Sequence, residues 1–143
     1  MNAAGRLDDI SVGIKCLLAD ELAEARVYAK TLGDLNQTRR QIEQDMSTEA
    51  LMIMSEVPTD LSGITLYDPN WHQGVIGIVA SRMREKYHRP VVVFADSGVG
   101  STKLIKGSGR SVSRVHIRDA FENIATRNPG LIETFGGHAM AAG

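Results

Sequence analysis

The chain has 143 residues, 43% hydrophobic and 23% charged, with a net charge of −1, which is the composition of an ordinary globular protein with sequence for about one domain. The single cysteine, Cys16, excludes an internal disulfide and a cysteine-based zinc site, and it fits a reducing cytoplasm. No apolar run approaches the ~20 residues that span a bilayer, and the N-terminus lacks the apolar segment of a secretory signal.

The first part of the chain is predicted to be helical. Apolar residues recur at helical spacing over 10–18, after Asp8 and Asp9, which suit an N-terminal cap and first turn. Asp20 has the character of the cap of a second helix that extends to about Glu56. At roughly 35 residues this helix is far longer than the mean of ~11–12, and its middle is almost wholly polar. Such a helix is typical of a rod between two bodies.

After a loop over 58–63 the pattern alternates between strands and helices. The predicted order is strand, helix, strand, strand, helix, over 64–67, 72–87, 91–95, 102–106 and 115–127. This order predicts an α/β (α+β) fold, in which a long helix precedes a mixed sheet with flanking helices. The last ten residues, TFGGHAMAAG, are predicted to be a turn that feeds a close-packed helix.

The net charge hides an asymmetry. Residues 1–62 carry 6 Lys/Arg against 11 Asp/Glu, whereas residues 63–143 carry 10 against 6. Five basic residues and no acidic one lie between Asp96 and Asp119: Lys103, Lys106, Arg110, Arg114 and Arg118. Such a cluster is either a solvated basic face or the binding surface for an anionic partner.

No motif forms a self-contained catalytic centre. The four histidines stand at least 16 residues apart, and neither a GxSxG nor a GxxxxGK[ST] motif is present. Binding motifs are more informative. In KGSGRS (106–111), glycines let backbone N–H groups approach an anion and the arginine can make forked hydrogen bonds to phosphate. The alternative interpretation of this stretch is a glycine-rich strand or hairpin.

Two further motifs suit an anion. FGGHAMAAG (135–143) combines two glycines, a histidine donor and small residues, although a lone histidine after a turn also serves in capping or packing. NWHQG (70–74) places Trp71, His72 and Gly74 at a predicted helix N-terminus, where N–H groups and the helix dipole favour negative charge.

Six motifs together resemble the RecJ family of the DHH phosphoesterase superfamily: NAAGRLDD, LNQTRRQIEQ, WHQGVIGIVASRMREKYHRPVVVFA, KGSGRS, HIRDAF and FGGHAMAAG. The resemblance extends over the whole chain. It implies that residues 1–19 end a DHH catalytic domain, that 20–57 form the long connecting helix, and that 58–143 form most of the DHH-associated domain. The resemblance also implies truncation at both ends, because in the family a strand and a helix follow the GGH motif.

The family resemblance implies a 5′→3′ exonuclease on single-stranded DNA with a 5′-phosphorylated end, dependent on Mn²⁺ or Mg²⁺ and serving recombination and repair. The Asp-x-Asp and Asp-His-His motifs that hold the metals have no match in this chain. We therefore expect no metal ligands here, and a segment that supplies the DNA-binding side of the cleft and is inactive alone.

The resemblance also assigns residues. Arg6 would face the cleft with Asn2 nearby, and His138 is the candidate for a catalytic role. The implied phosphate ligands are Arg6, Asn2, Ser108, Gly109, Arg110, Gly136, Gly137 and His138, with a secondary basic surface at Lys103, Lys106 and Arg114.

Two other functions remain open from the sequence. One is a non-catalytic RNA- or nucleotide-binding module, as in other DHH-family phosphodiesterases and alanyl-tRNA synthetases. The other is a structural piece that docks onto another protein through its long helix. Independently of these functions, the apolar face over 7–18 is expected to favour self-association.

Overall fold

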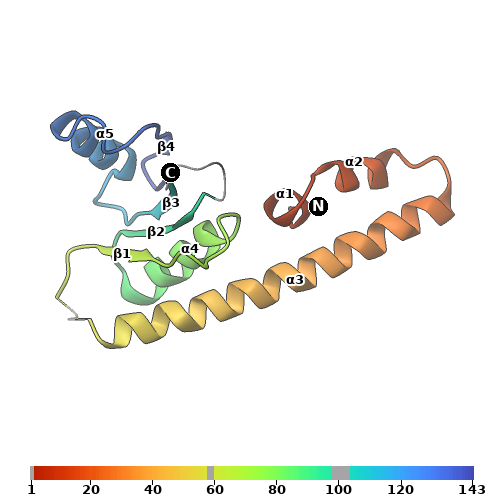
Figure 1. The fold of residues 1–143 in the computed structure, drawn as a ribbon, viewed down its shortest axis with the longest axis horizontal. Coiled ribbons are helices and arrows are strands. Elements are labelled where there is room, and N and C mark those ends of the chain that lie inside the picture. Colours follow the sequence, from red (N-terminus) through yellow and green to blue (C-terminus); the bar gives the residue numbers. More distant parts are fainter. Residues whose placement is uncertain (1, 58–59, 98–103) are drawn as a thin grey trace. The chain divides into compact units, whose positions relative to one another are not determined.

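The computed structural model describes residues 2–57, 60–97 and 104–143. The chain divides into two compact units, Met1–Asp45 and Met46–Gly143. The division falls inside helix α3 (Leu22–Ser55), a single element of 34 residues that belongs to both units (Figure 1). The prediction of one long helix ending near residue 56 is therefore confirmed.

The first unit begins with two short helices, α1 (Ala4–Leu7) and α2 (Ser11–Leu18). The prediction of a helix over 10–18 is confirmed, whereas the four-residue α1 was not predicted, since it is too short to show a period. The Asp9 carboxylate accepts hydrogen bonds from the backbone N–H of Ser11 at 2.9 Å and from its hydroxyl at 2.6 Å. These bonds hold the pKa of Asp9 below its usual value.

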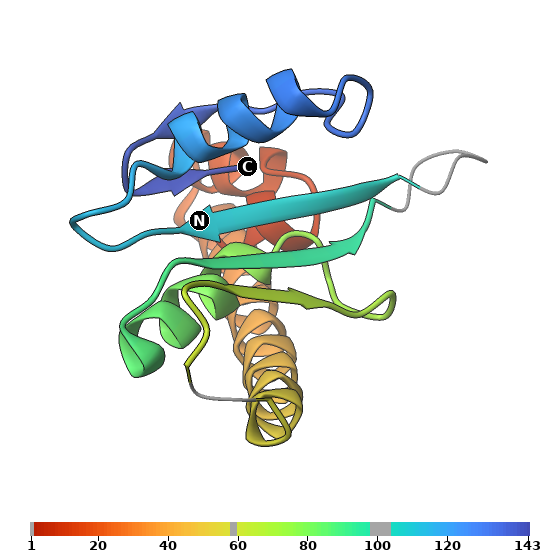
Figure 2. The same cartoon turned by 90° about the vertical axis from the view of Figure 1, so that its left-hand side faces the viewer.

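The second unit contains a five-stranded mixed sheet with the order β1-β2-β3-β5-β4 (Figure 2). The strands are β1 (Ile64–Tyr67), β2 (Val91–Asp96), β3 (Ile105–Arg110), β4 (Gly137–His138) and β5 (Ala141–Ala142). β1 and β2 are parallel and every other pair is antiparallel. This sheet with its helices confirms the predicted fold class.

Helix α4 (Ile76–Tyr87) connects β1 to β2 and packs on β2 and β3. Its apolar side chains Val79 and Met83 are buried, as are Val91 and Val93 of β2. The alternating burial of β2 shows that one face of the sheet lies against α4. This contact forms the main core of the second unit.

Helix α5 (Ile117–Arg127) packs on β4 and β5. Ile117 and Phe121 of α5 lie against Gly109 of β3. Because Gly109 points away from the face that α4 covers, α5 lies on the opposite face of the sheet. No helix in the described ranges combines the length and apolar character that crossing a membrane requires.

Candidate nucleic-acid interface

The KGSGRS motif lies in the middle of the sheet. Residues 105–110 form strand β3, paired with β2 along its length, with Ser108 opposite Val93 and Arg110 opposite Val91. A strand was predicted over 102–106, but the observed strand lies further along the chain. Residues 102 and 103 lie outside the described residues. The motif therefore forms a glycine-rich strand, one of the two conformations considered from the sequence, and not a turn.

Successive residues of β3 point to opposite faces of the sheet, so its polar side chains and its glycines lie on different faces. Ser108 and Arg110 face helix α4, where both approach Gly77. Gly107 and Gly109 point to the other face, where a Cβ at Gly107 would lie 2.5 Å from the Phe94 ring and a Cβ at Gly109 would lie 2.5 Å from Ile117. Glycine is needed at these two positions because neighbouring apolar side chains fill the space of a side chain.

Arg110 and Ser108 are in direct contact. Nη1 of Arg110 donates to the Ser108 hydroxyl at 3.1 Å and to the Gly109 carbonyl at 2.7 Å. Both residues are half-buried. The guanidinium is thereby oriented beside a hydroxyl, an arrangement that suits a phosphate group.

The GGH motif forms a hairpin next to this strand. β4 pairs with β5 across a turn at Ala139 and Met140, and β5 pairs with β3. The prediction that these residues feed a helix is wrong, because the small residues close a hairpin in which Gly137 adopts φ +133°. The hairpin turn is fixed to the chain after β3, since Ser111 N–H donates to the Met140 carbonyl at 2.9 Å.

The pairing brings the two motifs into one row across the sheet. Arg110 lies opposite Ala141, and Ala141 lies opposite His138. Paired residues share a face, so Arg110 and His138 lie on the same face about 10 Å apart, since neighbouring strands are about 4.8 Å apart. His138 is exposed, as are Gly136 and Gly137. The site is thus a row across three strands together with Ser108.

The other described residues predicted to bind phosphate lie outside the row formed by Arg110 and His138. Lys106 is exposed, lies opposite Ala95 and shares the face of Ser108 and Arg110. Arg114 is exposed in the loop before α5, and Lys103 lies outside the described residues. In the first unit, Asn2 and Arg6 are exposed at α1.

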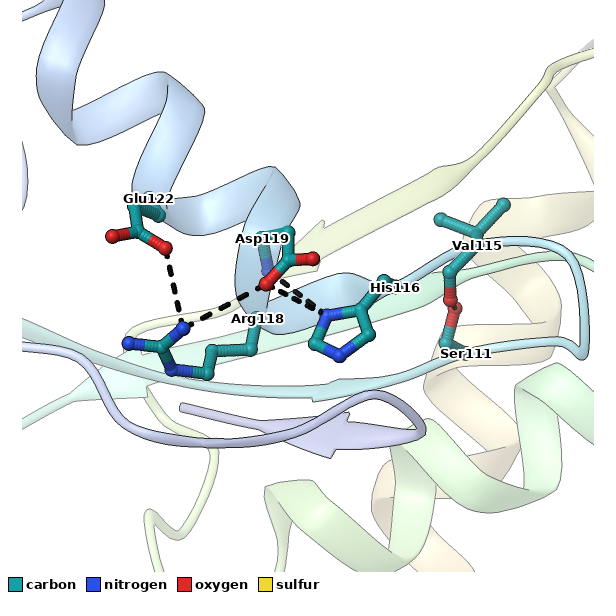
Figure 3. Close-up of polar contacts among 6 residues, drawn as sticks. All are labelled: Ser111, Val115, His116, Arg118, Asp119 and Glu122. Atoms are coloured by element: carbon teal, nitrogen blue, oxygen red, sulfur yellow. Dashed lines mark hydrogen bonds and ion pairs between the residues drawn. The ribbon is translucent and has the colours of Figure 1, made fainter.

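Arg118 does not add to this basic surface, although it belongs to the basic run of the sequence. Its Nη1 lies 3.2 Å from Glu122 and 3.7 Å from Asp119, so two carboxylates offset its charge (Figure 3). In the same view, His116 caps α5 by accepting a hydrogen bond from the Asp119 N–H at 3.2 Å. This network stabilises the helix start, and it was not predicted from the sequence.

The NWHQG motif has a structural role. Helix α4 begins at Ile76 rather than at residue 72, because His72 and Gly74 lie in a turn where His72 Nδ1 accepts from the Gly74 N–H at 3.1 Å. Trp71 is buried and donates to Glu49. The predicted helix N-terminus at these residues was therefore wrong.

Within the described ranges, no group of three or more His, Cys, Asp or Glu residues lies close enough together to hold a metal ion. The donors present in this part of the chain instead suit an anion. They are a guanidinium, a hydroxyl, an imidazole and a lysine on one face of the sheet.

Comparison with known proteins identifies relatives of this chain. The single-stranded-DNA-specific exonuclease RecJ proteins of Escherichia coli (strain K12) and Bacillus subtilis (strain 168) are 53% and 31% identical to this chain. Each match covers 100% of this chain, but only 25% and 17% of the respective relative. The chain thus spans about a quarter or less of the length of these curated relatives.

Solved structures agree. A crystal structure of RecJ in complex with Mg²⁺ from Thermus thermophilus superposes with a TM-score of 0.82 at 34% identity, over 99% of this chain and 20% of that one. A crystal structure of exonuclease RecJ bound to manganese gives a TM-score of 0.78 at 33% identity, over 98% of this chain and 32% of that one. The resemblance to RecJ carried by the sequence motifs is confirmed. Residues 60–143, more than half of the chain, match the DHHA1 domain, and the chain belongs to this family.

Proposed function

We propose that this chain is part of a RecJ-type 5′→3′ exonuclease of recombination and repair, that it works in the cytoplasm, and that it supplies the side of the cleft that holds single-stranded DNA. The observation that carries the proposal is the shared face of Ser108, Arg110 and His138 within a DHHA1 domain. The relatives are named for specificity toward single-stranded DNA.

The chemistry of this face suits the nucleic-acid backbone. Arg110 offers a planar set of donors, oriented by the Ser108 hydroxyl at 3.1 Å, and Lys106 adds a second positive charge along the same strand. Contacts of this kind bind phosphates independently of base sequence. A terminal 5′-phosphate carries more charge than an internal one, so we propose that Ser108 and Arg110, on either side of the buried Gly109, hold the 5′ end.

In this proposal, the residues that bind the metal ions lie in another part of the enzyme. RecJ structures contain Mg²⁺ or Mn²⁺, but the described residues of this chain do not form a suitable set of ligands. We therefore propose that this chain alone binds DNA without cleaving it. Residues 1–19 would then end the catalytic domain, with Asn2 and Arg6 toward the cleft, 20–57 would connect the lobes, and 58–143 would hold DNA beside Gly136, Gly137 and His138.

We also propose that the isolated chain self-associates through α2. Large apolar side chains in and around this helix are half exposed or more, including Leu17 at 70% and Leu18 at 73%. Apolar surface of this kind favours association in water. Sedimentation over a concentration series tests it: a sedimentation coefficient that does not rise with concentration would contradict self-association.

The central experiment titrates the chain into fluorescent single-stranded DNA with a 5′-phosphate or a 5′-hydroxyl, at low salt and with Mn²⁺. Anisotropy reports binding and gel electrophoresis reports cleavage. We expect binding without cleavage, and tighter binding of the phosphorylated strand. Preference for an RNA of the same sequence would instead indicate an RNA-binding module, and cleavage that persists in the purified chain would contradict its proposed inactivity.

A further inference from the structure

Gly77 lies in the first turn of α4, where this helix packs on β3. A Cβ atom at Gly77 would lie 3.0 Å from Nη2 of Arg110, 3.0 Å from the hydroxyl oxygen of Ser108 and 3.7 Å from Cζ of Arg110. Contacts at 3.0 Å are tighter than nine in ten of the contacts that real Cβ atoms make, so a neighbouring atom would have to shift by a few tenths of an ångström. The two polar side chains therefore use the space that any other residue would fill at this position.

The neighbours of Gly77 differ from those of the two glycines on β3. A side chain at Gly107 or Gly109 would collide with the apolar groups of Phe94 or Ile117. Those glycines are required by packing of the core. A side chain at Gly77 would instead meet the flexible polar ends of the two residues that face the proposed phosphate site.

We propose that Gly77 is a positioning residue of this phosphate site. Its missing side chain allows the Arg110 guanidinium to lie beside the Ser108 hydroxyl, with Nη1 at 3.1 Å from Oγ. A forked hydrogen bond to phosphate depends on the orientation of the guanidinium plane, so a small displacement weakens it. This inference rests on the proposed function, because it requires Arg110 to bind phosphate.

The substitution Gly77→Ala separates this role from a structural one. The atoms that must move are side-chain ends, which can shift at little cost to the fold, and alanine favours a helix more than glycine does. We therefore expect Gly77→Ala to keep the Tm of the wild-type chain while it disturbs the geometry of Arg110. The matched control is Gly33→Ala in α3, where nothing lies within 4 Å of the added Cβ.

The experiment measures the Tm and the affinity for a 5′-phosphorylated and a 5′-hydroxyl oligonucleotide. It uses the wild-type chain, Gly77→Ala, Gly33→Ala, Arg110→Ala and the double variant Gly77→Ala/Arg110→Ala. We expect Gly77→Ala to bind the phosphorylated strand about tenfold more weakly, the scale of one charge-assisted hydrogen bond, with a smaller preference for the phosphate. Gly33→Ala is expected to bind like the wild type, and the double variant no more weakly than Arg110→Ala.

Each alternative outcome has a distinct meaning. Wild-type affinity and phosphate preference in Gly77→Ala would overturn the role of Gly77 and leave the proposed function intact. An additive loss in the double variant would also overturn it, because Gly77 would then act independently of Arg110. A wild-type chain that does not bind single-stranded DNA would overturn the proposed function and this inference with it.

Discussion

The indole N–H of Trp71 donates a hydrogen bond of 2.7 Å to the carboxylate of Glu49. Trp71 is 4% exposed in the segment between β1 and α4, whereas Glu49 lies on α3. Buried on the same helix are Met46, Ala50 and Met54. The hydrogen bond and these apolar side chains together make the last turns of α3 part of the second unit.

Removing the Glu49 carboxylate tests how much this hydrogen bond contributes to holding α3 on the second unit. In Glu49→Ala the buried indole N–H loses its partner, and we expect the free energy of unfolding to fall by about 1–3 kcal/mol. Urea unfolding followed by fluorescence measures it, with Trp71 as the single tryptophan of the chain. Glu56→Ala, at an exposed carboxylate just beyond the same helix, is the control and is expected to be neutral. Equal stability of the two variants would show that the hydrogen bond contributes little.

A second prediction concerns Arg110. If Arg110 binds phosphate as proposed, Arg110→Ala removes one phosphate contact, so binding of single-stranded DNA should weaken to a similar extent for all base sequences. The slope of log affinity against log salt should decrease by about 0.7, the value for one phosphate contact on a single strand. Arg127→Ala removes the same charge from the exposed end of α5 and is expected to change the slope less. Identical slopes for the two variants would assign the effect to net charge alone.

A third prediction uses the glycine pair of the GGH motif. Gly137 adopts φ +133°, and a Cβ there would lie 2.5 Å from Cα of Ala142, whereas nothing lies within 4 Å of a Cβ at Gly136. Backbone strain alone should make Gly137→Ala destabilising by roughly 1–3 kcal/mol, and the collision adds to this cost. Gly136→Ala is expected to be close to neutral. Thermal unfolding of both variants distinguishes them, and similar Tm values would contradict the prediction.

A fourth prediction concerns the pKa of Tyr67. Its hydroxyl donates to Asp96 at 2.8 Å, and this bond raises the pKa of Tyr67, with smaller contributions from desolvation and the charges of Asp96 and Asp68. A raised pKa means that the contact stabilises the fold at neutral pH and that this contribution is lost as the pH rises through the pKa of Tyr67. Asp96→Ala should return the pKa of Tyr67 toward its usual value. Tyrosinate absorbance measures it.

The control for this titration is Glu24→Ala. A hydrogen bond of 3.2 Å to Glu24 raises the pKa of Tyr28, so this variant should lower the pKa of Tyr28 and leave Tyr67 unchanged. An unchanged pKa of Tyr67 in Asp96→Ala would show that the Tyr67–Asp96 bond does not persist in solution.

Periodicity alone predicted the elements whose residues carry a strong local signal. Helix α3 follows from its apolar spacing, and β1 and β2 follow from runs of apolar and β-branched residues. β3 has no such signal, because KGSGR contains residues that disfavour strands. Its conformation depends on pairing with β2, and this long-range contact is not visible in a local window.

The site was predictable in its residue types but not in its arrangement. The sequence indicated that Arg110 and His138 belong to motifs that suit an anion. That they lie in one row follows from the pairing of β5 with both β3 and β4, at separations of about 30 residues along the chain for the β3 contact. The same pairing places Gly137 in a hairpin, where the sequence predicted a turn into a helix.

Successive residues of strand β3 face opposite sides of the sheet and meet different surroundings. Gly107 and Gly109 are constrained by Phe94 and Ile117, whereas Ser108 and Arg110 face the other side of the sheet, where we propose that they bind phosphate. Because the two sets alternate along one strand, substitutions at the proposed phosphate-binding positions leave the glycines that close the core undisturbed. A scaffold of this kind can acquire new anionic ligands by divergence at two positions while its architecture is inherited unchanged.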